Sequence, residues 1–302
     1  MPSLRHQLLA RVVPRLRQAR ELDDERSERA RVERWHEGLD RSLPTSTVWR
    51  FEHRFSVVTE SLSGFASYSI ARRGTLPTRT ILYLHGGGFM APISAWQVSY
   101  AARMADELEA RVVLPDYPLA PEHTWRDSHR ELVELAERLA TGDELVIAGD
   151  SSGGGLALAI AESVRDRGGP QPSRLLLISP WIDLTTSTPE TPGLDAIDPW
   201  LFIGKVKAYA GWWAGTPEDL GRPEVSPGLG DLSGLPPALM FCGTRDLLVP
   251  GCRLLARRAA DAGWDLTYVE EPGLIHVYPL LPLIPEARRA WRRTVEFLQS
   301  SV

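Results

Sequence analysis

The pattern of apolar and polar positions changes character near residue 54. Before that point apolar residues recur every three or four positions, which predicts a helix with one apolar face. These residues are Leu4, Leu8, Leu9, Val12, Val13 and Leu16. A stretch of mixed charge then runs from Glu21 to Arg34 and ends at Trp35. We interpret this stretch as a solvated helix face, and the alternative is a lid element that packs through Leu22, Val32 and Trp35.

From residue 54 onward, short β-rich runs alternate with helical segments. Residues 55–62 and 66–72 are separated by Ser63-Gly64 and predict a hairpin. Further strands are predicted at Thr80–Leu84, Arg111–Leu114, Glu144–Ala148, Arg174–Ile178, Ala238–Cys242 and Leu266–Glu270. Helices are predicted near Gln97–Glu109, Ser128–Ala140, Gly153–Arg167, Gly251–Ala262 and Glu286–Leu298. This alternation predicts an α/β fold, with a mainly parallel sheet that has helices on both faces.

One region interrupts the alternation. Residues 184–222 are rich in Thr, Pro and Gly and then carry several aromatic residues. These are Trp200, Phe202, Tyr209, Trp212 and Trp213. Because the segment is too long for a plain connection, we expect an insertion that folds against the N-terminal helices. Its aromatic residues form either a small core of their own or part of a substrate pocket.

A Gly-x-Ser-x-Gly sequence follows one predicted strand and opens a predicted helix, at Gly149-Asp150-Ser151-Ser152-Gly153. A serine between glycines in this context is typical of a nucleophile elbow, in which a strained turn lifts the hydroxyl above the sheet. Only small neighbours fit such a turn. The spacing therefore predicts Ser151 as a catalytic nucleophile, and the alternative is an ordinary Gly-rich turn.

Three consecutive glycines follow the strand predicted at 80–84, in His85-Gly86-Gly87-Gly88-Phe89. Their backbone N–H groups can turn toward one point without side-chain obstruction, and acyl transfer needs such donors for a developing oxyanion. A phosphate-binding loop is the alternative, but the segment lacks the Gly-x-Gly-x-x-Gly spacing and no Gly-Lys-Ser/Thr follows. We interpret the segment as an oxyanion hole, in which His85 orients the loop and is not the general base.

A serine nucleophile needs a base, and the base needs an orienting acid. His276 is the single histidine that follows Ser151 in the sequence. It lies just past the strand predicted at 266–270, where a parallel sheet places its site. Asp246 follows the strand predicted at 238–242 and is our choice for the acid. The competing carboxyl groups are Asp183, Asp195, Asp198, Glu270 and Glu271.

Composition narrows the function further. The chain has 302 residues and a formal net charge of −5, so no basic field favours nucleic acid. Two cysteines, Cys242 and Cys252, are too few for a disulfide framework and are predicted to be buried thiols. The sequence shows no signal-peptide pattern and no membrane-spanning run. We expect a cytoplasmic protein that needs no metal or organic cofactor and has no nucleic-acid or membrane partner.

Several motifs occur in an order that resembles the hormone-sensitive-lipase-like esterases, bacterial family IV of the α/β-hydrolase fold. The motifs are His85–Phe89, Asp116–His123, Gly149–Gly154, Ser179–Leu184, Leu235–Pro237, Asp246–Leu248 and His276–Tyr278. The resemblance implies an eight-stranded, mostly parallel sheet flanked by helices, with a helical cap. Residues 54–183 and 223–302 would form the catalytic core, and residues 1–53 and 184–222 a discontinuous cap.

The resemblance also implies roles for single residues. The implied triad is Ser151, Asp246 and His276. The implied oxyanion donors are the backbone N–H groups of Gly87, Gly88 and Ser152. The residues expected to shape the loop and the substrate pocket are His85, Gly86, Phe89, Met90, Trp200, Trp212 and Trp213.

The chain departs from the family pattern at three places. Pro250 takes the position of a second acidic residue after Asp246, so we expect a supporting contact to be missing there. Ser152 replaces the commoner alanine; its main-chain donor remains, and its added hydroxyl narrows or polarises the pocket. Residues 90–92 lack a glycine that is often found there, which changes the shape of the loop on the acyl side.

The predicted activity is that of a carboxylesterase-type serine hydrolase, which hydrolyses small to medium hydrophobic esters through an acyl-enzyme. The same residues also suit an amidase or peptidase, a lactone hydrolase or an acyltransferase. A binding protein that has kept the fold is a further alternative, although such proteins can lose the catalytic histidine and His276 is present. The expected partner is a small-molecule ester, and a homodimer is compatible with the resemblance.

Overall fold

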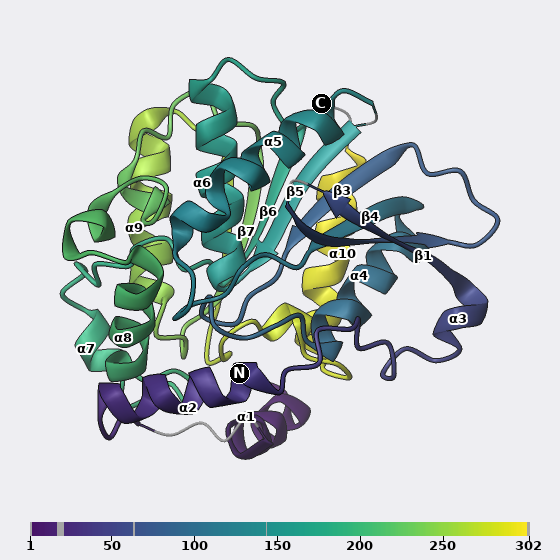
Figure 1. Ribbon diagram of the computed structural model, residues 1–302. Helices are drawn as coiled ribbons and strands as arrows, with labels where there is room; N and C mark the ends of the chain where they lie inside the picture. The colour runs from purple at the N-terminus through teal and green to yellow at the C-terminus, as the bar shows by residue number, and fades with distance from the viewer. Residues whose placement is uncertain (1, 17–20, 63, 143, 301–302) are drawn as a thin grey trace.

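The computed structural model describes residues 2–16, 21–62, 64–142 and 144–300. Its strands form one sheet in the order β1-β2-β4-β3-β5-β6-β7-β8 (Figure 1). They are β1 (Phe55–Leu62), β2 (Phe65–Arg72), β3 (Arg79–Leu84), β4 (Ala110–Pro115), β5 (Glu144–Asp150), β6 (Arg174–Ile178), β7 (Ala238–Gly243) and β8 (Leu266–Glu271). The pairs β1–β2 and β2–β4 are antiparallel and the others parallel. The predicted eight-stranded α/β fold and its hairpin are confirmed, although Ser63 lies outside the described residues.

The longer helices cover both faces of this sheet. They are α1 (Leu4–Leu16), α2 (Glu25–Glu37), α4 (Ala95–Glu107), α5 (His129–Ala140), α6 (Ser152–Asp166), α8 (Ile203–Ala214), α9 (Val249–Ala262) and α10 (Pro285–Gln299). Helices α5, α6 and α9 lie on one face, and α4 and α10 on the other (Figure 1). Strand β3 shows the consequence, because Leu82 and Leu84 join one buried cluster while Ile81 and Tyr83 join the other.

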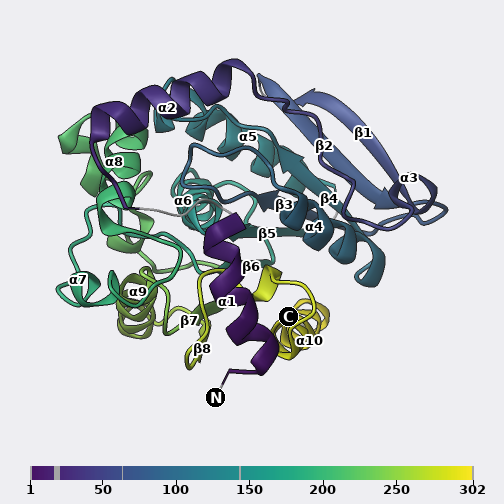
Figure 2. The ribbon, with the colours of Figure 1, turned by 90° about the horizontal axis from the view of Figure 1, so that it is seen from below.

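The insertion and the N-terminal segment pack on each other at one end of the sheet (Figures 1 and 2). The Tyr209 hydroxyl of α8 donates a 2.6 Å hydrogen bond to Glu28 of α2. The Trp212 indole N–H donates to Glu25 at 3.0 Å, and Lys205 forms a 3.2 Å ion pair with Glu28. The predicted contact between these two distant parts of the chain is therefore confirmed.

Helix α1 forms over the residues predicted to be helical, and its apolar face is only partly buried. The predicted face includes three outward residues, Leu4 (77% exposed), Leu8 (61%) and Val12 (43%). Val13 of the same face is fully buried, as is His6, whose Nε2 atom accepts a 3.2 Å hydrogen bond from the Ile275 N–H. Helix α1 thus contacts the core partly through a polar residue, while three residues of its apolar face stay exposed. The side chain of Leu16 lies outside the described residues.

The charged stretch that includes α2 has one packed side and one solvated side. Val32 is fully buried, and Leu22 is half-buried against the same cluster. Trp35 keeps 39% of its surface exposed. Both interpretations of this stretch therefore hold in part: it packs through Val32 and Leu22, and most of its charged residues face solvent, although Glu28 is buried.

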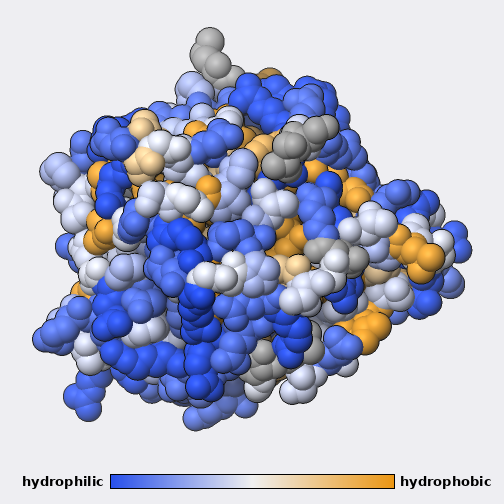
Figure 3. Space-filling view, turned by 90° about the horizontal axis from the view of Figure 1, so that it is seen from above, coloured by the Kyte–Doolittle hydropathy of each residue, from blue (hydrophilic) through white to orange (hydrophobic). Residues whose placement is uncertain are grey.

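The face of the molecule away from α1 and α2 is mostly hydrophilic, with scattered apolar residues (Figure 3). Within the ranges that the structure describes, every helix is too short or too polar to cross a membrane. The apolar residues are concentrated in the two clusters on either side of the sheet.

The contact between α2 and α8 predicts a pH-dependent contribution to stability. Glu28 is 6% exposed and accepts hydrogen bonds from Arg31 and Tyr209. The Arg31 hydrogen bond is the largest effect on the pKa of Glu28, which is lowered from 4.5 to about 2 although burial opposes the shift. Because the folded-state pKa is depressed, the stabilisation is present above pH 4.5 and is lost as the pH falls toward 2.

We expect Glu28→Gln to lower the free energy of unfolding by about 1–3 kcal/mol at pH 7, as measured by urea denaturation. The difference from the wild-type protein should shrink between pH 4.5 and pH 3. Glu33→Gln is the matched control, because Glu33 forms an exposed ion pair with Arg29 on the same helix. Its effect should stay within about 0.5 kcal/mol, and equal losses in both variants would contradict the assignment.

Candidate active site

Ser151 lies at a sharp turn between β5 and α6. Its φ of +53° is a conformation that few residues other than glycine adopt. Its N–H donates a 2.8 Å hydrogen bond to the Ile178 carbonyl, and its own carbonyl accepts one of 2.9 Å from the Trp181 N–H. A Cβ atom on Gly149 would overlap the carbonyl oxygen of Gly153. The close packing of β5 against α6 therefore requires glycine at position 149, and it fixes the turn that presents the Ser151 hydroxyl.

The structure brings Ser151, His276 and Asp246 together in a hydrogen-bonded row. His276 Nε2 lies 2.9 Å from Ser151 Oγ, and His276 Nδ1 lies 2.9 Å from Asp246 Oδ2. Asp246 follows β7 and His276 follows β8, so each side chain comes from a loop at the same edge of the sheet. The other carboxyl oxygen of Asp246 accepts a 3.0 Å hydrogen bond from the Leu248 N–H, and the Cys242 thiol donates to Oδ2 at 3.5 Å.

The charges around His276 favour its protonated form. Burial lowers the pKa of His276, but the charge and hydrogen bond of Asp246 outweigh it. The carboxylates of Asp198 and Asp150 add to the effect, so the pKa of His276 is raised above 6.5. A neutral imidazole with Nδ1–H directed at Asp246 leaves Nε2 free to accept the Ser151 proton.

Each of the five competing carboxyl groups has other partners, and Asp198 accepts a 2.7 Å hydrogen bond from the Leu247 N–H. Asp183 accepts hydrogen bonds from Thr185 and Ser187 within its own turn. Asp195 accepts a 2.7 Å bond from the Ile203 N–H. Glu270 pairs with Arg253, and Glu271 lies 3.6 Å from Arg289. Of the acids considered from the sequence, Asp246 is the one hydrogen-bonded to His276.

Three backbone N–H groups beside Ser151, those of Gly87, Gly88 and Ser152, donate to no acceptor among the described residues. Their neighbours are bonded: the Gly86 N–H donates to Asp150 at 3.0 Å, and the Phe89 N–H donates to the Ser152 hydroxyl at 3.3 Å. Gly87 has a φ of +128°, and a Cβ atom there would lie 2.8 Å from Ala91. The glycines leave donors that suit a developing oxyanion.

Sequence reasoning gave Asp150 no role, yet Asp150 holds the glycine loop. Its buried carboxylate accepts hydrogen bonds from the Tyr83 hydroxyl (2.8 Å) and the Gln97 amide (3.0 and 3.1 Å), as well as from the Gly86 N–H. Burial raises the pKa of Asp150, and the hydrogen bonds oppose that shift. Its position directly before the nucleophile was the available signal.

His85 lies fully buried behind the same loop. Its ring stacks on Tyr117 at 4.3 Å, and its Nδ1 atom lies 3.0 Å from the Gly86 carbonyl. The Tyr117 hydroxyl donates a 2.7 Å hydrogen bond to the His85 carbonyl. Burial lowers the pKa of His85 to about 4. The residue therefore stays neutral near pH 7 and packs into the support of the loop.

The predicted pocket residues fall into two groups. Phe89 stacks on Trp213 at 4.4 Å and lies 5.5 Å from Trp181. Trp213 is fully buried and belongs to the packing between the insertion and the core, whereas Trp212 bonds to Glu25 of α2, in the N-terminal segment. The Met90 carbonyl accepts from His36 of α2 at 2.7 Å, if His36 Nε2 carries the proton.

Trp200 belongs to the second group. Its ring lies edge-on to the His276 imidazole, with 5.5 Å between centroids and an interplanar angle of 85°. The Trp200 ring also lies edge-on to the ring of Trp96, with 6.2 Å between centroids. Trp200 is thus the predicted pocket aromatic that the structure places against the candidate base.

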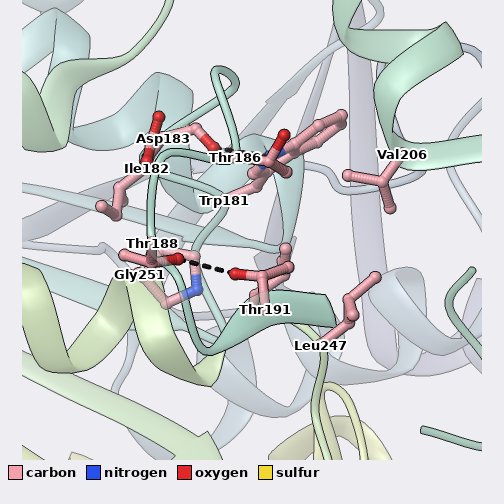
Figure 4. A pocket seen from close by; sticks show the side chains of 11 residues that line it. Trp181, Ile182, Asp183, Thr186, Thr188, Thr191, Val206, Leu247 and Gly251 are labelled. Atoms are coloured by element: carbon pink, nitrogen blue, oxygen red, sulfur yellow. Dashed lines mark hydrogen bonds between the residues drawn. The ribbon is translucent and has the colours of Figure 1, made fainter. Parts of the chain in front are cut away.

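A small cavity lies next to the loop that carries Asp246 (Figure 4). Residues from the segment after β6, from the insertion and from the start of α9 line it, among them Trp181, Thr188, Thr191 and Leu247. Thr188 and Thr191 are hydrogen-bonded at 2.6 Å. Its volume of about 20 Å³ is room for one water molecule. It is therefore too small to hold an ester.

Among the described residues, histidine, cysteine and acidic side chains nowhere gather in threes with a geometry that could hold a metal ion. Cys242 and Cys252 are buried free thiols, as predicted.

Comparisons with known proteins agree on one family. The family described as alpha/beta hydrolase fold matches residues 81–280. The chain is 33% identical over 229 residues to an acetyl-hydrolase of Streptomyces hygroscopicus, a match that covers 74% of this chain and 76% of that protein. It is 31% identical over 244 residues to the carboxylesterase NlhH of Mycobacterium tuberculosis, covering 76% and 75%.

Solved structures give the same result over nearly the full length. An esterase from the bacterial hormone-sensitive lipase family superposes with a TM-score of 0.80 and 26% identity, covering 99% of both chains. An esterase/lipase from an uncultured bacterium superposes with a TM-score of 0.79 and 27% identity, covering 98% of both. The chain belongs to the α/β-hydrolase fold family and, within it, to the hormone-sensitive-lipase-like carboxylesterases.

Proposed function

We propose that the protein hydrolyses carboxylic esters through a serine acyl-enzyme. The observation that carries the proposal is the hydrogen-bonded row of Asp246, His276 and Ser151, beside three backbone N–H groups that lack an acceptor among the described residues. The names of its relatives, acetyl-hydrolase and carboxylesterase, support the same reaction.

In the first step, Ser151 Oγ attacks the ester carbonyl carbon while His276 Nε2 takes the hydroxyl proton. Asp246 holds the Nδ1 proton in place and stabilises the imidazolium that forms. The carbonyl oxygen becomes negatively charged and accepts hydrogen bonds from the three backbone N–H groups. The bond to the alcohol oxygen then breaks, and His276 protonates that oxygen as it leaves.

In the second step, water attacks the acyl-enzyme. His276 removes a proton from the water, and the same backbone donors stabilise the second tetrahedral intermediate. When this intermediate collapses, His276 returns its proton to Ser151 Oγ and the carboxylic acid leaves. Every proton is therefore handled by one imidazole, whose orientation Asp246 fixes.

We propose that residues 1–53 and 184–222 form a cap over a core of residues 54–183 and 223–302. The contacts of Glu28 with Tyr209 and Lys205 support this division, because they join the two cap segments to each other. The aromatic residues Phe89 and Trp200 support a small to medium hydrophobic ester as substrate. The buried free thiols Cys242 and Cys252 support a reducing, cytoplasmic setting.

We expect Ser151→Ala to lower kcat for p-nitrophenyl esters by about 10⁴-fold or more, because the variant has no nucleophile. It should also lose labelling by a fluorophosphonate probe. Ser233→Ala is the matched control, since Ser233 is exposed and bonded to Asp231 in a surface loop. Wild-type rates in purified Ser151→Ala protein would refute the mechanism. A panel of acyl lengths, with matched amides, measures the substrate preference in the same assay.

The raised pKa of His276 predicts the acid side of the pH profile. Because the neutral imidazole is the base, kcat/KM should fall as the pH drops through a pKa above 6.5. Asp246→Asn removes the charge that raises this pKa, and burial of the imidazole remains. We expect residual activity lower by about 10⁴-fold, with its acid limb moved to lower pH. An unmoved acid limb in a correctly folded variant would contradict the assignment of Asp246.

A further inference from the structure

One turn of the insertion, residues 198–201, contacts the loops that carry both Asp246 and His276. The turn lies between the short helix α7 (Thr191–Leu194) and α8. Its first residue, Asp198, is 5% exposed. One oxygen of Asp198 accepts a 2.7 Å hydrogen bond from the N–H of Leu247, the residue that directly follows Asp246. The insertion is thus bonded to the backbone of the acid loop.

The same carboxylate also shapes its own turn. The second oxygen of Asp198 accepts hydrogen bonds from the Trp200 N–H at 2.7 Å and the Leu201 N–H at 3.0 Å. These bonds fix the backbone that carries the Trp200 ring, which lies edge-on to His276. A single buried side chain therefore links the acid loop on one side with the residue packed against the base on the other.

Burying the carboxylate of Asp198 does not by itself stabilise the fold. A buried charge is costly, and a second carboxylate near Asp246 adds repulsion. Burial, with the negative charge of Asp246 adding to it, raises the pKa of Asp198 to about 6. The three N–H donors and the positive charge that His276 acquires offset part of this cost.

We propose that Asp198 is a positioning residue, which aligns the Asp246 loop and His276 for proton transfer when the insertion is seated on the core. The inference rests on the proposed roles of Ser151, His276 and Asp246. Asp198 accepts from the Leu247 N–H and Asp246 itself accepts from the Leu248 N–H, so two consecutive N–H groups directly after Asp246 are held by carboxylates. This leaves Asp246 Oδ2 directed at the imidazole.

Asp198→Asn tests the proposal, because it keeps the size of the side chain and removes the charge. We expect kcat to fall by between about 10- and 100-fold through misalignment, with KM changed by less than about twofold. The charged groups that face His276 are the carboxylates of Asp246, Asp198 and Asp150. Loss of one of them should move the acid limb of kcat/KM to lower pH, which a purely structural role would not do.

Asp195→Asn is the matched control. Asp195 lies three residues earlier and accepts from the Ile203 N–H, which belongs to α8. We expect it to leave kcat and the acid limb as in the wild-type protein. The proposal would be overturned if folded Asp198→Asn had the kcat and the acid limb of the wild-type protein. It would also be overturned if Asp198→Asn and Asp195→Asn lowered kcat equally.

A second pair of variants keeps the proposal testable if Asp198→Asn fails to fold. Trp200→Phe keeps an aromatic edge toward His276 and should retain most of kcat, whereas Trp200→Leu should lower kcat more than KM changes. Equal kcat in both would overturn the proposal. Fluorophosphonate labelling of wild-type protein and of Ser151→Ala separates this result from a failure of the proposed function, since that labelling depends on the nucleophile.

Discussion

The hydrogen bond between His276 and Asp246 is the interaction on which the rest of the site depends. Asp246 has no exposed surface and His276 is 3% exposed, so water cannot stabilise a charge on either group. Each group therefore needs the other, and the Leu248 N–H and the Cys242 thiol complete the surroundings of the carboxylate. Parallel strands bring these residues together, because Ser151 follows β5, Asp246 follows β7 and His276 follows β8. All three strands end at the same edge of the sheet.

The parts of the fold that the sequence predicts well are those set by local patterns. Strands β3 to β8 are predicted within a residue or two of their observed bounds. Continuous apolar runs mark β3 to β7, because strands buried on both faces leave little choice of composition, whereas β8 is a partly buried edge strand. The turn at Ser151 is predictable for a similar reason, since a Cβ atom on Gly149 would overlap the backbone of α6 and one on Gly153 would overlap the backbone at the end of β3. The position of His276 followed from the order of the motifs and from the edge at which parallel strands end.

The parts that could not be predicted depend on contacts between distant segments. The sequence predicts helix α1 but not which of its residues are buried, because His6 is buried against Ile275, which lies far away in the sequence. Trp212 and Trp213 looked like pocket residues, but their environment depends on how α8 meets α2 and Phe89. Asp198 looked like one more acidic residue of an insertion, because sequence spacing carries no sign of its bond to Leu247.

Pro250 shows how these distant contacts act together. Its position in the family pattern suggested that the acid loop lacks a supporting contact. In the structure Pro250 lies in the first turn of α9, where a missing N–H costs nothing, and the loop before it is bonded to Asp198 of the insertion. If the proposed roles hold, the backbone of the Asp246 loop is supported by the turn at residues 198–201 of the insertion and not by a second acidic residue of the loop. The same turn carries Trp200, which lies against His276. A change in that segment should therefore alter kcat together with substrate choice, because the same turn carries Trp200 and holds Asp246.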